Sequence, residues 1–343
     1  MTDEEKLQEL LVLTRANGEP NINVLWRIAK DLEAIKLNIK FFGYELAKRL
    51  AEALPPPDQR GFRPIDLHCK PSTQADLEAD WSRHWSGQLK IAHVFHRKVW
   101  EFAYVLQALK QLGCLRPGAK GLGFGCGEEP LPSYLAGQGC AVTMTELPPD
   151  DERAQIWASS GEYGTLETAF YPELVDRARY DSLMDFRFVN MNAIPADLHG
   201  YDFCWSVCAF EHLGSIRQGI DFIVNSMATL KAGGVSVHTT EFNFMNDEET
   251  IDNWPTVLYQ RRHFEEMAAR LSAEGHRVLP LDFDVGSKPL DKFIDIPPYN
   301  HDWKFDQADK WRGGNEHMKL EIDGFAVTCF GLVAIKDGLR AGP

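Results

Sequence analysis

The stretch GLGFGCGEEPLPSYLAGQGCAVTMTE, residues 121–146, contains the elements that decide the fold. An apolar strand ends at Phe124, a glycine-rich turn and a short helix follow, and a second strand ends at Glu146. Gly125 and Gly127 let the backbone turn sharply and let a ligand approach the main chain, because neither has a Cβ. Glu146 follows Gly127 by 19 residues, where a carboxylate can accept both hydroxyl hydrogens of a ribose. The stretch therefore predicts a site for a nucleoside-containing cofactor.

The same alternation of short strands and helices continues toward the C-terminus. Strands are predicted at 119–124, 140–145, 186–190, 202–207, 235–240, 277–283 and 325–335. Helices fit between them at about 131–138, 215–231 and 261–273. This order predicts an α/β fold with a mostly parallel sheet. No helix follows the last strand, so we expect that strand to run antiparallel.

The N-terminal region predicts a long helix with one narrow apolar stripe. Its apolar residues are spaced alternately by three and four positions, as in a coiled-coil heptad: Leu25, Ile28, Leu32, Ile35, Ile39, Phe42 and Leu46. Two interpretations fit the stripe equally well. The 24–50 helix pairs with a second copy to form a homodimer, or it lies across its own domain.

A proline-rich connector separates this helix from the rest of the chain. Pro55, Pro56 and Pro57 end the helix, and the connector carries Trp81 and Trp85 as packing anchors. We therefore divide the chain into an N-terminal helical extension with its connector, residues 1–88, and a main domain, residues 89–343.

Composition excludes several classes of protein. Hydrophobic residues make up 44% and charged residues 25%, as in ordinary globular chains. A net charge of −14 repels phosphate backbones and anionic lipid heads, so we expect neither nucleic acid nor membranes as partners. The acidic start and the lack of a long apolar run predict a cytoplasmic protein. The 7 scattered cysteines are expected to be free and mostly buried.

A second helix is predicted over residues 91–112. Opposite its apolar face lie His93, Arg97, Trp100 and Tyr104. A solvated face seldom carries both Trp and Tyr, so this face contacts a cleft or another segment. We name Arg97, Trp100 and Tyr104 as candidate substrate residues, with Arg97 able to clamp an acidic acceptor. Packing against another segment is the alternative.

Charge distinguishes the candidate cofactors. The pyrophosphate of a dinucleotide would lie against the glycine turn, beside Glu128 and Glu129, which repel it. S-adenosylmethionine has no phosphate there and carries a sulfonium and an ammonium. No Gly-Lys-Ser/Thr follows the turn, which excludes a P-loop. A glycine turn that binds no ligand stays open as an alternative.

Four segments in order resemble the class I S-adenosylmethionine-dependent methyltransferases over residues 91–335. They are the loop FGCGEEP, the acid Glu146, FVNMNAIP at 188–195, and YDFCWSVCAFEHLG at 201–214 followed by LKAGG. The resemblance implies a Rossmann-like, doubly wound seven-stranded sheet with strand 7 antiparallel, here with an N-terminal helical extension. It also implies S-adenosyl-L-methionine as the cofactor.

The resemblance further implies a role for each matching position. The loop under the methionine part of the cofactor comprises Gly123, Gly125, Cys126 and Gly127, while Glu146 holds the ribose, Asn190 and Met191 contact the adenine, and Cys208 follows the fourth strand. Asn190 stands where the family commonly has Asp, and its amide oxygen can still accept a hydrogen bond. Gly123 stands where the family often has an acid, which leaves open how the ammonium is held. Glu101 and Glu128 are candidates.

The methyl acceptor is expected beside residues 208–212, where the family brings the two reactants together. Methyl transfer is an in-line displacement, so alignment is the main task of the protein. His212 is the candidate base if the acceptor must lose a proton, and a structural Glu–His pair is the alternative. Glu211 and His238 are further catalytic candidates, and Glu241 is a substrate candidate, because ligands collect at the carboxyl ends of parallel strands.

No metal site is expected. Cys204 and Cys208 lack a second ligand pair, and His301 and Asp302 are adjacent residues in a predicted loop. The stretches 147–185 and 284–323 predict a lid with aromatic walls, formed by Trp157, Tyr163, Tyr171, Trp303 and Trp311.

The sequence as a whole predicts an S-adenosylmethionine-dependent methyltransferase that acts on an oxygen of a small or carbohydrate-like acceptor. Two alternatives belong to other classes. One is a nicotinamide-dependent oxidoreductase, and the other is a protein that binds S-adenosylmethionine without catalysis.

Overall fold

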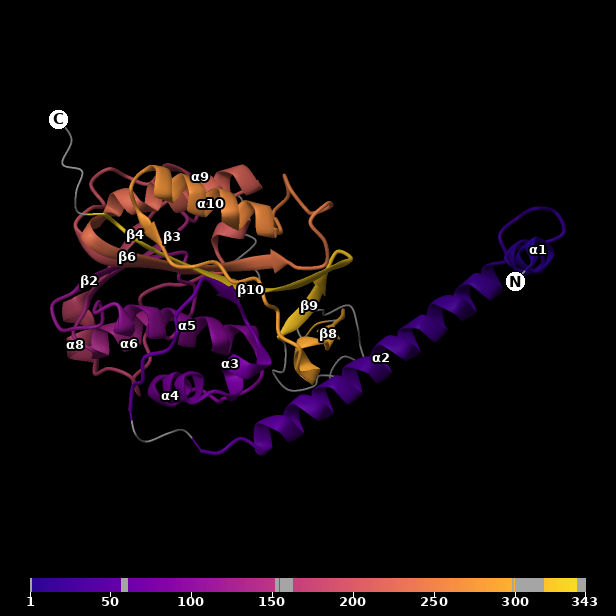
Figure 1. Cartoon of the computed structure of the whole chain (residues 1–343), viewed down its shortest axis with the longest axis horizontal. Coiled ribbons are helices and arrows are strands. Elements are labelled where there is room, and N and C mark those ends of the chain that lie inside the picture. Colours follow the sequence, from indigo (N-terminus) through magenta and orange to yellow (C-terminus); the bar gives the residue numbers. More distant parts are fainter. Residues whose placement is uncertain are drawn as a thin grey trace.

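One twisted sheet organises the body of the protein (Figure 1). The computed structural model describes residues 2–56, 61–151, 154, 163–297, 299 and 318–337. Along the sheet the strands are β4 (Met184–Phe188), β3 (Ala141–Glu146), β2 (Lys120–Phe124), β5 (Tyr201–Val207), β6 (Leu230–Asn243), β10 (Phe325–Ile335), β9 (Lys319–Ile322) and β8 (Ile294–Asp295). Two short strands, β1 (Lys70–Pro71) and β7 (Arg277–Val278), pair with β10 outside this order.

The predicted Rossmann-like topology is confirmed. Strands β4, β3, β2, β5 and β6 are parallel, and β10 runs antiparallel to both β6 and β7. The sheet has 10 strands instead of the seven expected, because β1, β8 and β9 extend it. The strand expected at 277–283 is reduced to β7, since Pro280 has no N–H to donate to the neighbouring strand.

Helices cover both faces of the sheet (Figure 1). One face is covered by α9 (Ile216–Ser226) and α10 (Arg261–Ala273). The other is covered by α5 (Arg97–Gln111) and α6 (Leu131–Gly137), with α3 (Gln74–Glu78) and α4 (Asp80–Leu89) outside α5 and α8 (Arg177–Leu183) against α6. Single turns of 3₁₀ helix are η1 (Met191–Ala193), η2 (Phe210–His212), η3 (Met227–Thr229) and η4 (Pro289–Asp291). Coverage on both faces explains why most residues of the central strands β2, β3, β5 and β6 are buried.

The helix expected at 91–112 begins later than predicted. The N-cap of α5 is His96, whose side chain accepts a hydrogen bond from the Lys98 N–H at 3.0 Å. Such a cap satisfies one of the free N–H groups at the helix start, so the residues before it stay irregular.

The connector packs into the body. Trp81 and Trp85 are buried, as predicted, and the Trp85 indole donates to Gln107 Oε1 on α5 at 2.7 Å. Strand β1 extends the same sheet. The division at residues 88 and 89 stays a prediction about domains, and in space α3 and α4 share the core of the sheet.

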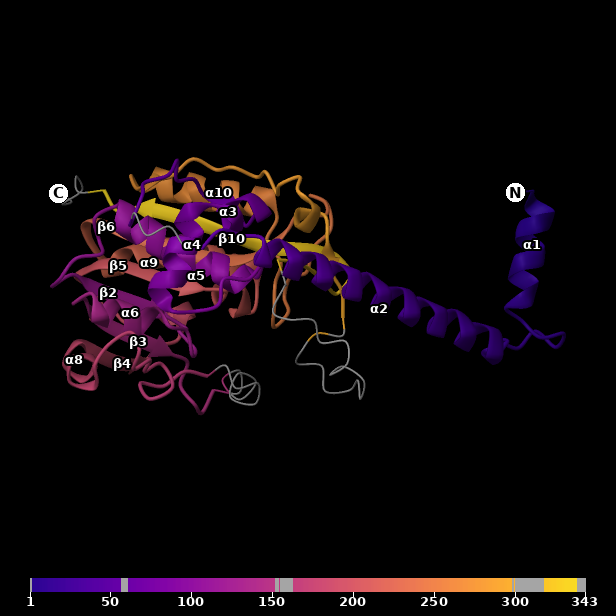
Figure 2. The ribbon, with the colours of Figure 1, turned by 90° about the horizontal axis from the view of Figure 1, so that it is seen from below.

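The N-terminal helices stand away from the body (Figures 1 and 2). Among the described residues, it is the C-terminal part of α2 (Ile22–Glu52) that contacts the body, and α1 (Asp3–Val12) lies at the far end of α2. A buried ion pair fixes this contact, with Lys40 Nζ 2.6 Å from Asp295 Oδ1, and the Tyr44 hydroxyl donates to the other carboxylate oxygen at 2.9 Å. Within the described residues no helix has the length and apolar character needed to cross a bilayer.

Candidate functional site at the carboxyl ends of the parallel strands

The glycine turn after β2 lies against the segments that follow β4 and β5. Gly125 and Gly127 have φ values of 57° and 55°, a region that side chains with a Cβ rarely adopt. A Cβ placed on Gly125 would lie 3.0 Å from Ala209 Cβ and 3.8 Å from Met191 Sδ. The fold therefore brings the glycine turn, the start of η1 and the end of β5 to one place.

Glu146 closes this place from β3. Its Oε1 accepts a hydrogen bond from the Gly127 N–H at 2.5 Å. Burial raises the pKa of Glu146 to about 7, although hydrogen bonds from the main chain of Gly127, Gly164 and Leu147 oppose the shift. A carboxylate offers about four acceptor positions, so a ribose that binds here has to replace part of these contacts.

Asn190 and Met191 are the third predicted element, after β4. Asn190 caps η1, and its side chain accepts from the Asn192 N–H at 3.0 Å. Met191 is the residue whose sulfur lies beside Gly125. These residues predicted to bind the cofactor thus lie close together. They belong to the glycine turn after β2, the end of β3 and the segment that follows β4.

Gly123 has a steric constraint. A Cβ there would lie 2.3 Å from Cys126 Sγ and 2.5 Å from the ring of Trp205. The position has no room for an acidic side chain. A carboxylate does lie against Trp205, whose indole donates to Glu129 Oε1 at 2.7 Å.

Glu129 corrects the charge argument made from the sequence. It is buried, and burial raises its pKa to about 8, so at neutral pH most of it carries no charge. Glu128 is exposed, and water screens it. Repulsion of a pyrophosphate by these two residues is therefore weaker than the sequence indicated.

A different feature of the turn disfavours a pyrophosphate. Helix α6 has Pro130 as its N-cap and Pro132 in its first turn. Proline has no N–H, so this helix start lacks donors that normally bind phosphate oxygens.

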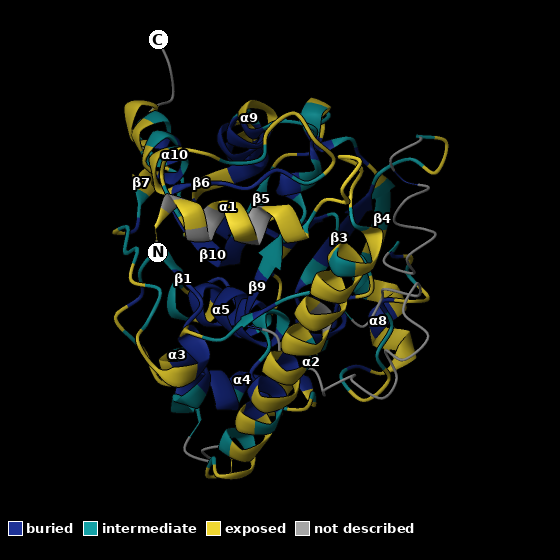
Figure 3. Ribbon diagram, turned by 90° about the vertical axis from the view of Figure 1, so that its right-hand side faces the viewer, coloured by how far each residue is buried: buried dark blue, intermediate teal, exposed yellow. Residues whose placement is uncertain are grey.

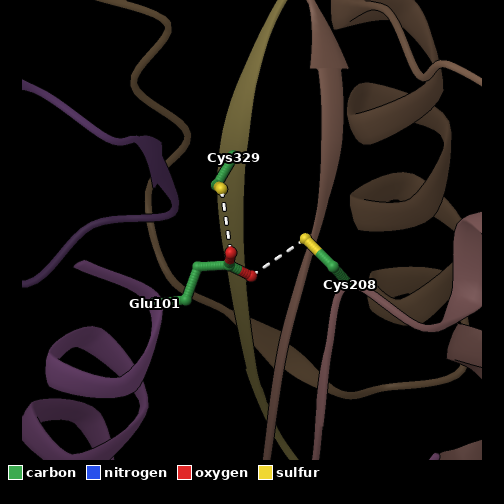
Figure 4. Close-up of side chains that lie close together, drawn as sticks. All are labelled: Glu101, Cys208 and Cys329. Atoms are coloured by element: carbon green, nitrogen blue, oxygen red, sulfur yellow. Dashed lines mark hydrogen bonds between the residues drawn. The ribbon is translucent and has the colours of Figure 1, made fainter. Parts of the chain in front are cut away.

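Next to the turn, α5, β5 and β10 meet in a buried polar cluster (Figure 4). Glu101 Oε2 accepts from Cys208 Sγ at 2.9 Å, and its Oε1 accepts from Cys329 Sγ at 3.1 Å. The Thr239 hydroxyl also donates to Glu101. Burial alone would raise the pKa of Glu101, but the charges of Lys98 and Arg97 and these hydrogen bonds lower it, so Glu101 is an anion.

Two more carboxylates extend this cluster. Glu241 forms an ion pair with Arg97, and Glu211 accepts from the Thr240 hydroxyl at 2.9 Å. Glu211 Oε1 and Glu241 Oε2 are buried, and neither has a hydrogen-bond partner among the described residues. A buried acceptor without a donor is costly, so each of these oxygens has unused hydrogen-bonding capacity.

Cys208 joins the two halves of the cluster. It has a φ of 47°, in the left-handed region, which turns the chain sharply at the end of β5. Such a backbone is strained in a non-glycine residue, and strain of this kind is common at functional sites.

His212 lies at the rim of the cluster. Its Nδ1 is 3.0 Å from the Pro255 carbonyl oxygen, and its Nε2 is 3.9 Å from Glu211 Oε1. The ring is partly exposed, so a bound acceptor can reach it.

His238 lies in a different environment. It is buried in β6, its Nδ1 is 2.7 Å from the Ser206 hydroxyl, and its ring contacts Phe210 and Phe222. Burial lowers its pKa to about 3. These contacts are those of a structural histidine, so His238 takes no part in the chemistry proposed below.

Trp100 and Tyr104 face the connector and not a cleft. Both are buried, and their rings stack with centroids 4.7 Å apart. The Trp100 indole donates to Asp76 Oδ2 at 2.9 Å, and the Tyr104 hydroxyl donates to the His68 carbonyl at 2.7 Å. The substrate role predicted for these two rings is therefore corrected to packing, and only Arg97 of that helix face reaches the cluster.

Two groups of side chains bring potential metal ligands within 4.8 Å of one another, namely Glu101, Cys208 and Cys329, and Cys208, Glu211 and Glu241. The sequence did not indicate either group. The positive charges of Arg97 and Lys98 lie against the same carboxylates and oppose a divalent cation there.

The predicted aromatic lid is described only in part. The Tyr163 hydroxyl donates to the Leu147 carbonyl and the Tyr171 hydroxyl to the Glu128 carbonyl, at 2.7 and 2.5 Å. Both therefore lie beside the glycine turn. The other three residues of the predicted lid, Trp157, Trp303 and Trp311, are outside the described part of the chain, and so are His301 and Asp302.

A cavity of about 680 Å³ lies apart from this site, between α9, α10 and residues 248–252. None of the predicted site residues lines it.

The sequence did not indicate Thr239 or Cys329 as site residues. No spacing relates these two to the glycine turn, because they approach it only through the pairing of β5, β6 and β10. Glu129 follows Gly127 by two residues, but the sequence indicated it only as a charge beside the turn. The one available signal was Pro130, which keeps Glu129 from continuing into the helix.

No known protein family and no curated protein match this chain. Many solved structures have a similar fold, and three of them serve as examples. The cyclase SpnF is 15% identical and covers 65% of this chain and 77% of its own, with a TM-score of 0.42. An S-adenosylmethionine-dependent methyltransferase from Mesorhizobium loti is 12% identical and covers 67% and 96%, with a TM-score of 0.37. The 1,6-didemethyltoxoflavin-N1-methyltransferase from Burkholderia thailandensis, which holds its substrate and S-adenosylhomocysteine, is 15% identical and covers 67% and 74%, with a TM-score of 0.34. Likeness of this degree describes a fold and assigns no activity.

Proposed function

We propose that this protein is an S-adenosyl-L-methionine-dependent methyltransferase that methylates an oxygen of a small or carbohydrate-like acceptor. The observation that supports this is a row of buried carboxylates along the carboxyl ends of the parallel strands: Glu101, Glu129, Glu146, Glu211 and Glu241. Arg97 and Lys98 are the cations that lie among them in the described part of the chain. The row has more acids than cations, so it favours a ligand that brings positive charge.

The raised pKa values support the same conclusion. Glu129 and Glu146 have pKa values of about 8 and about 7, because each is buried without a cation in contact. A positively charged ligand would favour their ionised forms, whereas a pyrophosphate would disfavour them. This is a reason to prefer the sulfonium cofactor over a nicotinamide dinucleotide.

Each part of the cofactor has residues that fit it. Glu146 is placed to accept the ribose hydroxyls, and Met191 to pack beside the adenine with Asn190 next to it. Glu129, beneath the glycine turn, is placed to hold the ammonium in place of the acid that Gly123 cannot supply. When bound, S-adenosylmethionine supplies an activated methyl group.

The acceptor side is formed by the cluster around Cys208. Arg97 and Glu241 hold each other there, and the free oxygens of Glu211 and Glu241 can accept hydrogen bonds from acceptor hydroxyls. The residues around Cys208 would align the acceptor oxygen with the methyl group that the bound cofactor would supply, with the cofactor sulfur as the leaving group. His212 accepts the proton that the hydroxyl loses, and Glu211 beside it stabilises the resulting imidazolium.

Calorimetry tests the cofactor. We expect S-adenosylhomocysteine to bind, and NAD and NADP to give no heat. 5′-Methylthioadenosine lacks the ammonium of S-adenosylhomocysteine. Comparison of the two ligands therefore distinguishes the ammonium end of the site from the nucleoside end. Glu129→Gln should weaken S-adenosylhomocysteine binding about 10- to 100-fold and leave methylthioadenosine unchanged, because only the first ligand carries the charge.

The exposed neighbour Glu128→Gln has the same charge change and is the matched control. Dinucleotide binding without nucleoside sulfide binding contradicts the proposal. Binding of the cofactor without transfer of labelled methyl groups to any hydroxylated acceptor identifies a non-catalytic binding protein instead.

A further inference from the structure

The long helix α2 carries an apolar surface that the described part of the chain does not cover. We call it the seam, and it consists of Leu25, Ile28, Leu32, Ile35, Ile39, Phe42 and Leu46. All seven residues are exposed (Figure 3), from 38% at Leu46 to 68% at Phe42. A soluble protein rarely exposes so many large apolar side chains in one line, and such lines mark interaction surfaces.

The seam and the contact with the body lie on different faces of α2. Lys40, Tyr44 and Ala47 are buried against the body, whereas Phe42 and Leu46, between them in sequence, are exposed. Another helix can therefore reach the seam along its full length without displacing the body. The helix has 31 residues, so it is about 46 Å long.

The spacing of the seam indicates what covers it. Steps of three and four residues alternate without exception, which makes a stripe two residues wide per heptad. Trp26 and Phe41 are also exposed on α2, off the seam. The regular spacing of the seam fits a second helix with the same repeat, whereas the net charge of −14 opposes an anionic lipid surface. We propose that two copies of this chain pair through the seam, with their α2 helices antiparallel. This inference does not depend on the proposed function.

The identity of the seam residues favours the antiparallel direction. In the heptad of the seam, residues 25, 32, 39 and 46 are the a positions and residues 28, 35 and 42 are the d positions. Leu occupies three of the four a positions and Ile occupies two of the three d positions. In parallel coiled coils this combination favours four strands over two. An antiparallel pair instead sets each a residue against a d residue of the second copy. Leu25 then packs on Phe42, Ile28 on Ile39 and Leu32 on Ile35, each pair occurring twice by symmetry.

The charged residues that flank the seam favour this register over one shifted by seven residues. A shift by one heptad would place Asp31 beside Glu45 of the second copy and Lys36 beside its own counterpart. In the register proposed, Asp31 faces Asn38 and Lys36 faces Ala29, so no like charges meet.

Antiparallel pairing also gives α1 a partner. Leu7, Leu11 and Val12 on α1 are exposed at the far tip of α2 (Figures 1 and 2). The antiparallel arrangement brings this tip beside the body of the second copy, whereas a parallel one leaves it distant from both bodies.

The mass of the full chain in solution tests the pairing. The chain has a mass of 38.8 kDa, and we expect twice that value by light scattering and sedimentation. Ile35→Glu should raise the dissociation constant at least about a hundredfold, because two buried isoleucines are lost in each dimer. Its neighbour Ala34→Glu makes the same addition of charge off the seam and should leave the dimer intact. Both positions are exposed, so neither change threatens the folded body. A monomeric wild-type chain, or equal association of the two variants, overturns the proposal.

Cysteine cross-linking tests the direction. In the antiparallel register Leu25→Cys and Phe42→Cys chains cross-link when mixed, and Leu25→Cys alone does not cross-link. Wild-type protein treated in the same way reports any background from the native cysteines. Self-cross-linking of Leu25→Cys shows parallel helices and overturns the antiparallel arrangement.

Discussion

Replacement of Glu146 by Gln gives the sharpest test of the cofactor site. The side chain keeps its size but loses its charge, and it exchanges one acceptor oxygen for an N–H₂ donor. Hydrogen bonds to a charged group contribute about 1.5–3 kcal/mol, so we expect the variant to bind S-adenosylhomocysteine about 10- to 150-fold more weakly. Glu128→Gln, an exposed change directly after Gly127, should bind like the wild type.

The pH dependence of binding makes this test specific. The pKa of Glu146 in the ligand-free protein is raised to about 7, so the carboxylate predominates above neutral pH and the neutral acid below it. Ribose hydroxyls donate more strongly to the carboxylate, and affinity should therefore fall as the pH drops through 7. Between pH 8 and pH 6 the ionised fraction falls by about tenfold, and the wild-type dissociation constant should rise by about the same factor.

Isothermal calorimetry at pH 6, 7 and 8 measures both effects. The Glu146→Gln variant has no proton to lose at this position, so its affinity for 5′-methylthioadenosine, which lacks the ammonium assigned to Glu129, should be flat over the range where the wild type changes. A wild-type affinity that does not depend on pH, or a variant that binds as tightly as the wild type, refutes the role assigned to Glu146.

Two further substitutions test the acceptor side of the site and the contact between α2 and the body. His212→Gln should lower the methyl-transfer rate by about 10²–10⁴-fold with S-adenosylhomocysteine affinity unchanged, and equal loss of both would show a structural role instead. Asp295→Asn leaves the buried Lys40 ammonium without its counter-ion, so urea denaturation should show a loss of about 3–5 kcal/mol in unfolding free energy. The double variant with Lys40→Met should recover part of that loss, and an unchanged midpoint in the single variant would mean that water reaches the pair.

Much of the fold follows from local patterns. The elements around the glycine turn lie within a residue or two of their predicted bounds, because strand and helix periodicities are set by near neighbours in sequence. Gly127 and Glu146 meet as expected, since parallel strands end at one edge of the sheet.

The contacts of helix α5 could not be predicted in this way. Its sequence shows that one face carries Trp100 and Tyr104, but not what lies against them. The answer is the connector and β10, which are distant in sequence and approach only when the sheet is assembled.

The charge states of buried carboxyl groups also depend on contacts made only in the folded chain, whereas local patterns are set within one segment. By itself the sequence determined the glycine turn and the heptad of α2, because each is a repeat or spacing within one segment. Only the tertiary structure decided that Glu129 is buried and largely neutral, that Glu101 is an anion held by thiols from two strands, and that the α2 seam stays uncovered by the described body. Burial sets these properties, and burial is the sum of contacts from segments that no local pattern connects.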